Sequence, residues 1–306
     1  MIKPMPDSSE GVTLVVGSDS LIGAALIVEL RKTGQRVVGT TRRQETVDES
    51  NLHLDLSPDP AEWNCPWPVS VAVLCAGVTS IETCRRKPAT TARVNVDGIS
   101  ALAKSLATQG AFVVYLSTNQ VFDGSEAGRR ADDPTSPVTE YGRQKAEAEG
   151  HISRLVGSIS IVRLTKVLHP DTPLFSRWRD ALDQGDPVQP FSDMYMAPVP
   201  LDLVVTVLRL VCERRLEGVL QVSGNRDVSY AEAALVGARM LGADEGLVEP
   251  VRSRDRSGGV EPNPRHTTLN TDSVESTLGI APPDVRETIE MAFGKSRTRS
   301  TVVHPS

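Results

Sequence analysis

The chain of 306 residues has few of the features that mark membrane, metal-binding or disulfide-rich proteins. No apolar run approaches the roughly 18 residues of a membrane-spanning helix, and residues 1–10 lack the apolar core of a signal peptide. The four cysteines form no CxxC pair, which favours reduced thiols in a cytoplasmic protein. Five scattered histidines show no metal-ligand spacing, so we predict no metal site.

Basic and aromatic residues are also scarce. Lys and Arg number 33 against 39 Asp and Glu, and this net charge of −6 argues against nucleic-acid or membrane-surface partners. Aromatic residues make up 4%, which leaves few platforms on which a substrate base could stack. The remaining composition, 39% hydrophobic and 24% charged, is that of a folded protein of about two domains.

Short apolar runs alternate with helical stretches through the first half of the chain. This pattern predicts an α/β fold, a Rossmann-type doubly wound parallel sheet with helices on both faces. Strands are expected at residues 12–16, 36–40, 52–54, 69–75, 111–117 and 158–164, and helices at 21–32, 89–107 and 138–155.

Prolines interrupt this rhythm after about residue 164. We therefore predict a dinucleotide-binding domain over residues 1–165 and a smaller α/β substrate lobe over 166–293. Some segments of the lobe could return to the first domain. The polar residues 294–306 are expected to form a flexible tail.

A glycine-containing turn joins the first strand to the first helix. Glycines allow positive φ and close approach of a pyrophosphate, while the helix N-terminus supplies N–H donors. The spacing fits the GxxGxxG turn of extended short-chain dehydrogenases, with serine at the middle position. A plain strand–turn–helix is the alternative to dinucleotide binding at this segment. The residues concerned are Gly17, Ser20, Leu21, Ile22 and Gly23.

The end of the second strand carries Arg42 and Arg43, where an NAD-selective site usually has a carboxylate. Guanidinium groups match a 2′-phosphate bidentately, so the pair predicts NADP(H). Solvated surface arginines are the alternative. Asp55, followed by Leu56, could face the adenine or could start the turn at Ser57.

Tyr141 and Lys145 lie four residues apart on a predicted helix and so share one face. A nearby ammonium would stabilise the phenolate and bring the pKa of the tyrosine toward the working range of a proton donor. Thr118, or less favourably Ser117, ends the fifth strand at the edge of the sheet where α/β ligands bind. A surface Tyr–Lys pair is the competing interpretation.

Residues 116–124, LSTNQVFDG, and residues 140–150, EYGRQKAEAEG, resemble the dTDP-4-dehydrorhamnose reductase family of extended short-chain dehydrogenases, along about residues 12–293. The resemblance implies that Thr118, Tyr141 and Lys145 are catalytic. It also implies hydride transfer from NADPH to C4 of a nucleotide-diphospho-4-keto-6-deoxysugar, a step of polysaccharide biosynthesis. Further residues are carried over as cofactor-lining or supporting (Cys75, Ala76, Gly77, Asn95) and as substrate-contacting (Val78, Asn119, Lys166, Arg265).

This chain departs from the family pattern at two substrate positions. Asn119 replaces the usual aspartate, and Lys166 stands where these reductases have a tryptophan, so its ammonium could meet a carboxylate or phosphate or could be a surface group. Three other functions stay open. They are a sugar-nucleotide epimerase, a dehydratase, and a non-catalytic NADP-binding subunit like the beta subunit of methionine adenosyltransferase. Helices on the outer face of the sheet would suit a symmetric homodimer.

Overall fold

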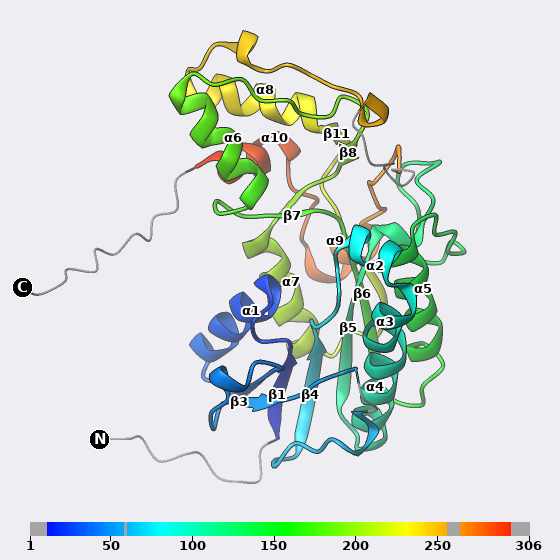
Figure 1. Cartoon of the computed structure of the whole chain (residues 1–306). Coiled ribbons are helices and arrows are strands. Elements are labelled where there is room, and N and C mark those ends of the chain that lie inside the picture. The colour runs from blue at the N-terminus through cyan, green and yellow to red at the C-terminus, as the bar shows by residue number, and fades with distance from the viewer. Residues whose placement is uncertain (1–10, 58–59, 256–263, 295–306) are drawn as a thin grey trace, which may run out of the picture.

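The computed structural model describes residues 11–57, 60–255 and 264–294. A sheet of seven parallel strands forms its centre, in the order β3-β2-β1-β4-β5-β6-β10 (Figure 1). The order reverses direction between β1 and β4, as in doubly wound nucleotide-binding folds. The strands are β1 (Val12–Val16), β2 (Val37–Thr41), β3 (Asn51–His53), β4 (Val69–Leu74), β5 (Phe112–Thr118), β6 (Ile159–Leu164) and β10 (Gly218–Val222).

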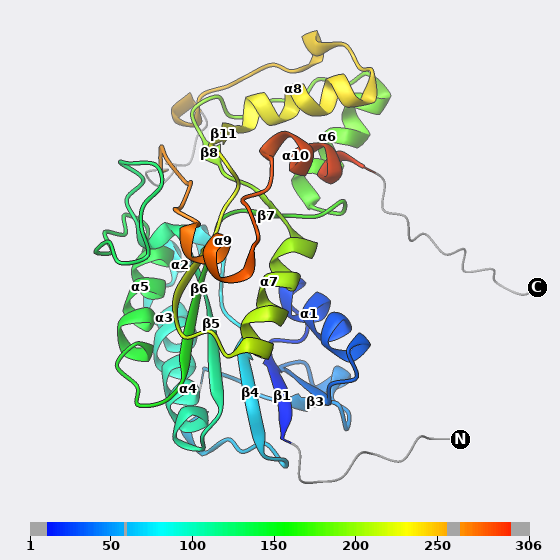
Figure 2. The same cartoon turned by 180° about the vertical axis from the view of Figure 1, so that it is seen from behind.

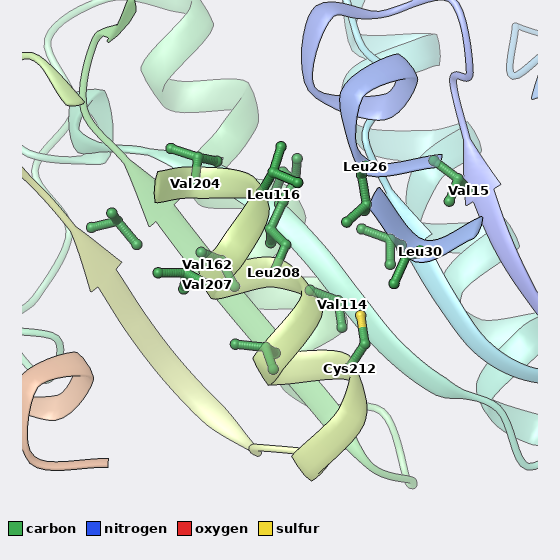
Figure 3. Close-up of a cluster of buried hydrophobic side chains, with 14 of the residues drawn as sticks. Val15, Leu26, Leu30, Val114, Leu116, Val162, Val204, Val207, Leu208 and Cys212 are labelled. Atoms are coloured by element: carbon green, nitrogen blue, oxygen red, sulfur yellow. The ribbon is translucent and has the colours of Figure 1, made fainter. Parts of the chain in front are cut away.

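Helices α1 (Leu21–Lys32) and α7 (Leu201–Arg214) cover one face of the sheet. Figure 3 shows Leu26 and Leu30 of α1 and Leu208 of α7 packed over the strands. The opposite face is covered by helices visible in Figures 1 and 2. These are α2 (Ile81–Arg86), α3 (Pro88–Ala92), a π-helical segment (Arg93–Gly98), α4 (Ile99–Thr108) and α5 (Glu140–Ile152).

A smaller lobe lies beyond the carboxyl ends of the strands (Figure 2). Its core joins Phe175, Trp178 and Phe293, whose rings meet at centroid distances of 5.2 to 5.5 Å. The lobe contains α6 (Pro173–Gln184), α8 (Tyr230–Leu241), α10 (Val285–Phe293) and the paired strands β8 (Tyr195–Met196) and β11 (Val228–Ser229). Strands β7 (Val167–Leu168) and β9 (Val199–Pro200) link it to the sheet.

The doubly wound α/β fold predicted from the sequence is confirmed, but the chain does not divide into two consecutive units. Helix α7 and strand β10 lie within the range assigned to the substrate lobe but return to the sheet, as the sequence analysis allowed for some segments, and α9 (Asp272–Leu278) packs on the same side through Val274. The helix expected at 89–107 is broken into α3, the π-helical segment and α4. Short 3₁₀ turns occupy Gln44–Thr46, Pro60–Glu62, Asn119–Val121, Glu245–Leu247 and Ser253–Asp255.

Two predictions can be compared with the described part of the chain only. Across those residues, none of the helices is both long and apolar enough to cross a membrane. The same residues contain no cluster of three or more His, Cys, Asp or Glu side chains that could hold a metal ion. The predicted tail lies outside the described residues, apart from Gly294.

Candidate active site

A cavity of about 440 Å³ opens at the carboxyl ends of β4, β5 and β6 and is closed on its far side by the smaller lobe. A second cavity of about 310 Å³ lies along the ends of β1 and β2. Ala76 and Gly77, directly after β4, line both cavities and so join them. This is the crevice at the reversal of strand order where doubly wound folds bind their ligands.

The turn after β1 is shaped for close approach of the backbone. Gly17 has φ +88°, and a Cβ there would lie 2.9 Å from the backbone of Ala76. At Gly23 a Cβ would lie 2.2 Å from the Gly17 carbonyl oxygen. Ser20 caps α1, since its Oγ accepts from the Gly23 N–H at 3.1 Å and donates to the Gly17 carbonyl at 2.8 Å. The serine that interrupts the glycine pattern therefore closes the turn itself.

The second cavity contains most of the residues predicted for the adenosine end of a dinucleotide. Arg42 lines it, whereas Arg43 does not and instead forms an ion pair with Asp19 at 3.2 Å. Asp55 also lines it while accepting from the N–H and the hydroxyl of Ser57, both at 2.8 Å, so it starts that turn as well. These two hydrogen bonds lower the pKa of Asp55. Val78, which the resemblance assigned to the substrate, lines this cavity and not the larger one, and the other predicted residues here are Gly17, Ser20, Leu56, Ala76 and Gly77.

Thr118 and Tyr141 meet at the larger cavity from two different elements. Thr118 ends β5, and its Oγ1 accepts from the Gln120 N–H at 3.2 Å. Tyr141 lies in the first turn of α5, and the next residue, Gly142, lets that helix approach closely, because a Cβ there would lie 2.1 Å from the Gln120 carbonyl oxygen. The helix is thereby seated directly on the turn that follows Thr118.

Lys145 lines the same cavity one turn further along α5. Its Nζ donates to the Leu116 carbonyl at 2.5 Å and lies 4.0 Å from the centre of the Tyr115 ring. Burial lowers the pKa of Lys145 to about 7, although Glu149 opposes this shift.

The electrostatics of Tyr141 differ from the sequence expectation. Burial, with Cys84 nearby, raises the pKa of Tyr141 above its ordinary value, instead of the lowering expected from a neighbouring ammonium. The reason is that desolvation dominates at both groups and disfavours the phenolate and the ammonium alike. Tyr141 is therefore protonated at neutral pH.

Asn95 connects the cofactor turn to the catalytic helix. Its Oδ1 accepts from the Val78 N–H at 2.7 Å, and its Nδ2 donates to the Val78 carbonyl and to Gln144 Oε1, both at 2.9 Å. Asn95 lies in the π-helical segment, a distortion frequent at functional sites. The sequence analysis missed Gln144, which is 2% exposed and donates to Thr91 Oγ1 at 2.9 Å. Its position between Tyr141 and Lys145 in the sequence could have indicated that Gln144 lies close to the site.

The structure sorts the remaining predicted residues clearly. Cys75, Ile22, Asn119 and Lys166 line the larger cavity. Leu21 lines neither cavity and is 42% exposed. Arg265 is exposed and does not line the larger cavity, although its neighbours Pro264 and Thr267 do. Cavity-lining residues that the sequence did not single out include Met194, Tyr195, Met196 and Tyr230.

An apolar groove of about 560 Å³ continues from the larger cavity into the smaller lobe. Met194 and Tyr230 line both spaces. The sequence predicted few stacking platforms, yet the fold concentrates them here. Five of the twelve aromatic residues line the cavity or the groove: Tyr141, Trp178, Phe191, Tyr195 and Tyr230.

These features define a dinucleotide-binding α/β protein of the short-chain dehydrogenase/reductase class. They are the doubly wound fold, the glycine turn after β1, and one cavity lined by Thr118, Tyr141 and Lys145. Residues 12–297 match the family described as RmlD substrate binding domain. The chain belongs to this family, so the resemblance to the dTDP-4-dehydrorhamnose reductases is confirmed.

The similar proteins include reductases and a subunit of a methionine adenosyltransferase. The dTDP-4-keto-6-deoxy-D-glucose reductase of Streptomyces niveus is 29% identical over 264 residues, covering 85% of this chain and 88% of that protein. The methionine adenosyltransferase 2 subunit beta of Bos taurus is 25% identical over 320 residues, covering 95% and 91%. Among solved structures, dTDP-4-dehydrorhamnose reductase of Bacillus anthracis in complex with NADP superposes with a TM-score of 0.82 at 17% identity, covering 93% of this chain and 99% of that one.

Proposed function

We propose that this protein is an NADPH-dependent reductase that acts on the 4-keto group of a nucleotide-diphospho-4-keto-6-deoxysugar. The observation that carries the proposal is the meeting of Thr118, Tyr141 and Lys145 at one cavity, directly beside the glycine turn after β1. The reductase relatives act on sugars of this class by their names. We propose that the protein works in the cytoplasm and that its partner is a nucleotide sugar.

The residues along the crevice fit a nicotinamide dinucleotide. Gly17 and Gly23 let the turn pack tightly against Ala76 and against itself, where a Cβ would clash, and the α1 N-terminus adds N–H donors for a pyrophosphate. Arg42 would hold a 2′-phosphate and Lys145 the nicotinamide ribose. When bound, the cofactor supplies the hydride that reduces the ketone.

The protein's own task is to hold the ketone and deliver a proton. Tyr141 donates its phenolic proton to the carbonyl oxygen as that oxygen becomes a hydroxyl, and its raised pKa keeps that proton in place at neutral pH. Thr118 orients the same oxygen by a hydrogen bond. The ammonium form of Lys145 then stabilises the phenolate that remains.

A screen of NADPH oxidation against dTDP- and UDP-linked 4-keto-6-deoxyhexoses tests the proposal. Turnover with at least one sugar is the expected outcome, because all three catalytic groups are present. The similarity to methionine adenosyltransferase 2 subunit beta supports a second candidate, a non-catalytic regulatory subunit. NADPH binding without turnover on any sugar in the screen would favour that candidate and contradict the reductase.

The wild-type protein is expected to bind NADPH about tenfold more tightly than NADH, because Arg42 lines the adenosine cavity. Arg42→Gln should remove this preference and leave the NADH affinity unchanged. Arg43→Gln is the matched control, since Arg43 does not line the cavity, although its ion-pair partner Asp19 does. Fluorescence titration measures the affinities of the wild type and both variants for NADPH and for NADH. Equal affinity of the wild type for both cofactors would contradict the role proposed for Arg42.

A further inference from the structure

Among the described residues, the larger cavity is lined by basic but not by acidic side chains, although the chain as a whole carries −6. Its lining, taken over the described residues, includes Lys145 and Lys166 and neither an aspartate nor a glutamate. A cleft lined by charges of one sign attracts ligands of the opposite sign. This lining therefore favours a ligand that carries an anionic group.

The two lysines are not equivalent. Lys145 already donates to the Leu116 carbonyl at 2.5 Å and contacts the Tyr115 ring. Of the ion pairs formed within residues 11–57, 60–255 and 264–294, none includes Lys166. The Lys166 side chain is solvent-exposed within the open cavity, and desolvation by the surrounding protein lowers its pKa.

The backbone around Lys166 is held firmly at the link between the sheet and the smaller lobe. Its carbonyl accepts from the Val199 N–H at 2.9 Å, and the preceding Thr165 donates from Oγ1 to the Ala197 carbonyl at 2.5 Å. The next residue, Val167, begins the β7–β9 pair. The lysine therefore projects from a fixed point of the chain.

The register of the sheet sets Lys166 close to the reacting end of the cavity. Leu164 is the partner of Thr118 across β5 and β6, and Lys166 follows two residues later, roughly 7 Å further along the chain. The extended side chain of lysine can span a comparable distance. Lys166 thus lines the cavity that contains Thr118 and Tyr141 and not the adenosine cavity, whose lining does not include it.

We infer that Lys166 is a specificity residue that binds an anionic oxygen of the substrate, an inference that rests on the proposed nucleotide-sugar chemistry. The anionic oxygen has two possible sources. One is the diphosphate that every nucleotide sugar carries. The other is a carboxylate on the sugar, which would make the preferred substrate a sugar acid in place of a 6-deoxysugar. In both cases the ligand supplies the negative charge that the described lining of this cavity lacks.

Isothermal titration of wild type, Lys166→Met and Lys104→Met with UDP, dTDP, UDP-glucose and UDP-glucuronate tests the inference, with and without NADP⁺. Lys104 is an exposed lysine of α4 and serves as the control for the charge change. Lys166→Met should weaken binding about tenfold, the usual loss for a charged hydrogen bond. Lys166→Arg should restore most of it. Thermal unfolding checks that all variants fold.

The pattern across the probes identifies the anion. Equal weakening of all four probes assigns Lys166 to the diphosphate, and weakening confined to UDP-glucuronate assigns it to a sugar carboxylate. Unchanged affinity for every probe, or a wild type that binds none of them at millimolar concentration, overturns the inference. Because the assay measures binding, a failure of turnover in the NADPH screen remains a separate result that concerns the proposed reaction.

Discussion

The Tyr141→Phe protein is expected to lose about 10³-fold in kcat for 4-ketosugar reduction, because it lacks only the group that donates the proton. Phenylalanine keeps the ring in the first turn of α5, so the helix and its contact with the Gln120 turn should persist. NADPH affinity should stay within about twofold, since this hydroxyl is assigned to the ketone and not to the cofactor phosphates. Single-turnover absorbance of NADPH measures the chemical step directly.

Tyr230→Phe provides the matched control for Tyr141→Phe. Tyr230 lines the same cavity from the smaller lobe, and its ring meets Trp178 at 6.3 Å between centroids. Deleting this hydroxyl should change kcat by no more than about tenfold, the effect of losing one ordinary hydrogen bond. If Tyr141→Phe retained turnover within tenfold of wild type, the proton would have to come from another donor, and Thr118 would be the next group to test.

The central strands were predictable because they are buried on both faces. All residues of β1 and β5 are buried, so their apolar runs are continuous and their ends differ from expectation by no more than one residue. The sequence left open that segments of the lobe return to the sheet, but that these are α7 and β10 was not predictable in the same way. Their local patterns specify a helix and a strand, but membership of a lobe depends on which faces they pack against, as α7 does against α1.

The same distinction holds for the candidate site, where local sequence patterns were predictable and contacts between distant segments were not. The glycine turn and the Tyr141–Lys145 spacing are local patterns, and the structure brings both to the crevice. Arg42 and Arg43 are adjacent and chemically identical, yet Arg42 lines the adenosine cavity whereas Arg43 pairs with Asp19. The apolar groove and the basic lining of the larger cavity likewise depend on segments far apart in sequence.

A buried ion pair joins the catalytic helix to the sheet. Arg163 and Glu149 are 4% and 5% exposed, and Arg163 Nη2 lies 2.7 Å from Glu149 Oε2. Arg163 also donates to the Ala131 carbonyl at 3.1 Å and to Gln221 Oε1 at 3.2 Å. Its guanidinium lies 5.0 Å from the centre of the Phe122 ring. One side chain thereby ties α5, β6, β10 and the segment after Thr118 together.

Arg163→Met should lower the free energy of unfolding by about 3–5 kcal/mol, because it leaves the Glu149 carboxylate buried without its partner. Urea unfolding, followed by circular dichroism, measures the change. The surface pair Arg286–Glu290 is the control, with side chains 68% and 38% exposed. Arg286→Met should cost no more than about 0.5 kcal/mol, since an exposed i,i+4 pair contributes little.

The double variant Glu149→Met/Arg163→Met separates the cost of an unpaired charge from the value of the pair itself. Removing both charges should bring stability back to within about 2 kcal/mol of wild type, because two apolar side chains can replace a buried ion pair of similar volume. A double variant as unstable as Arg163→Met would instead assign the loss to the bonds with Ala131 and Gln221. Turnover of a refolded double variant then shows whether the pair also positions Tyr141 and Lys145, since Glu149 lies one helical turn beyond Lys145 on the same face of α5.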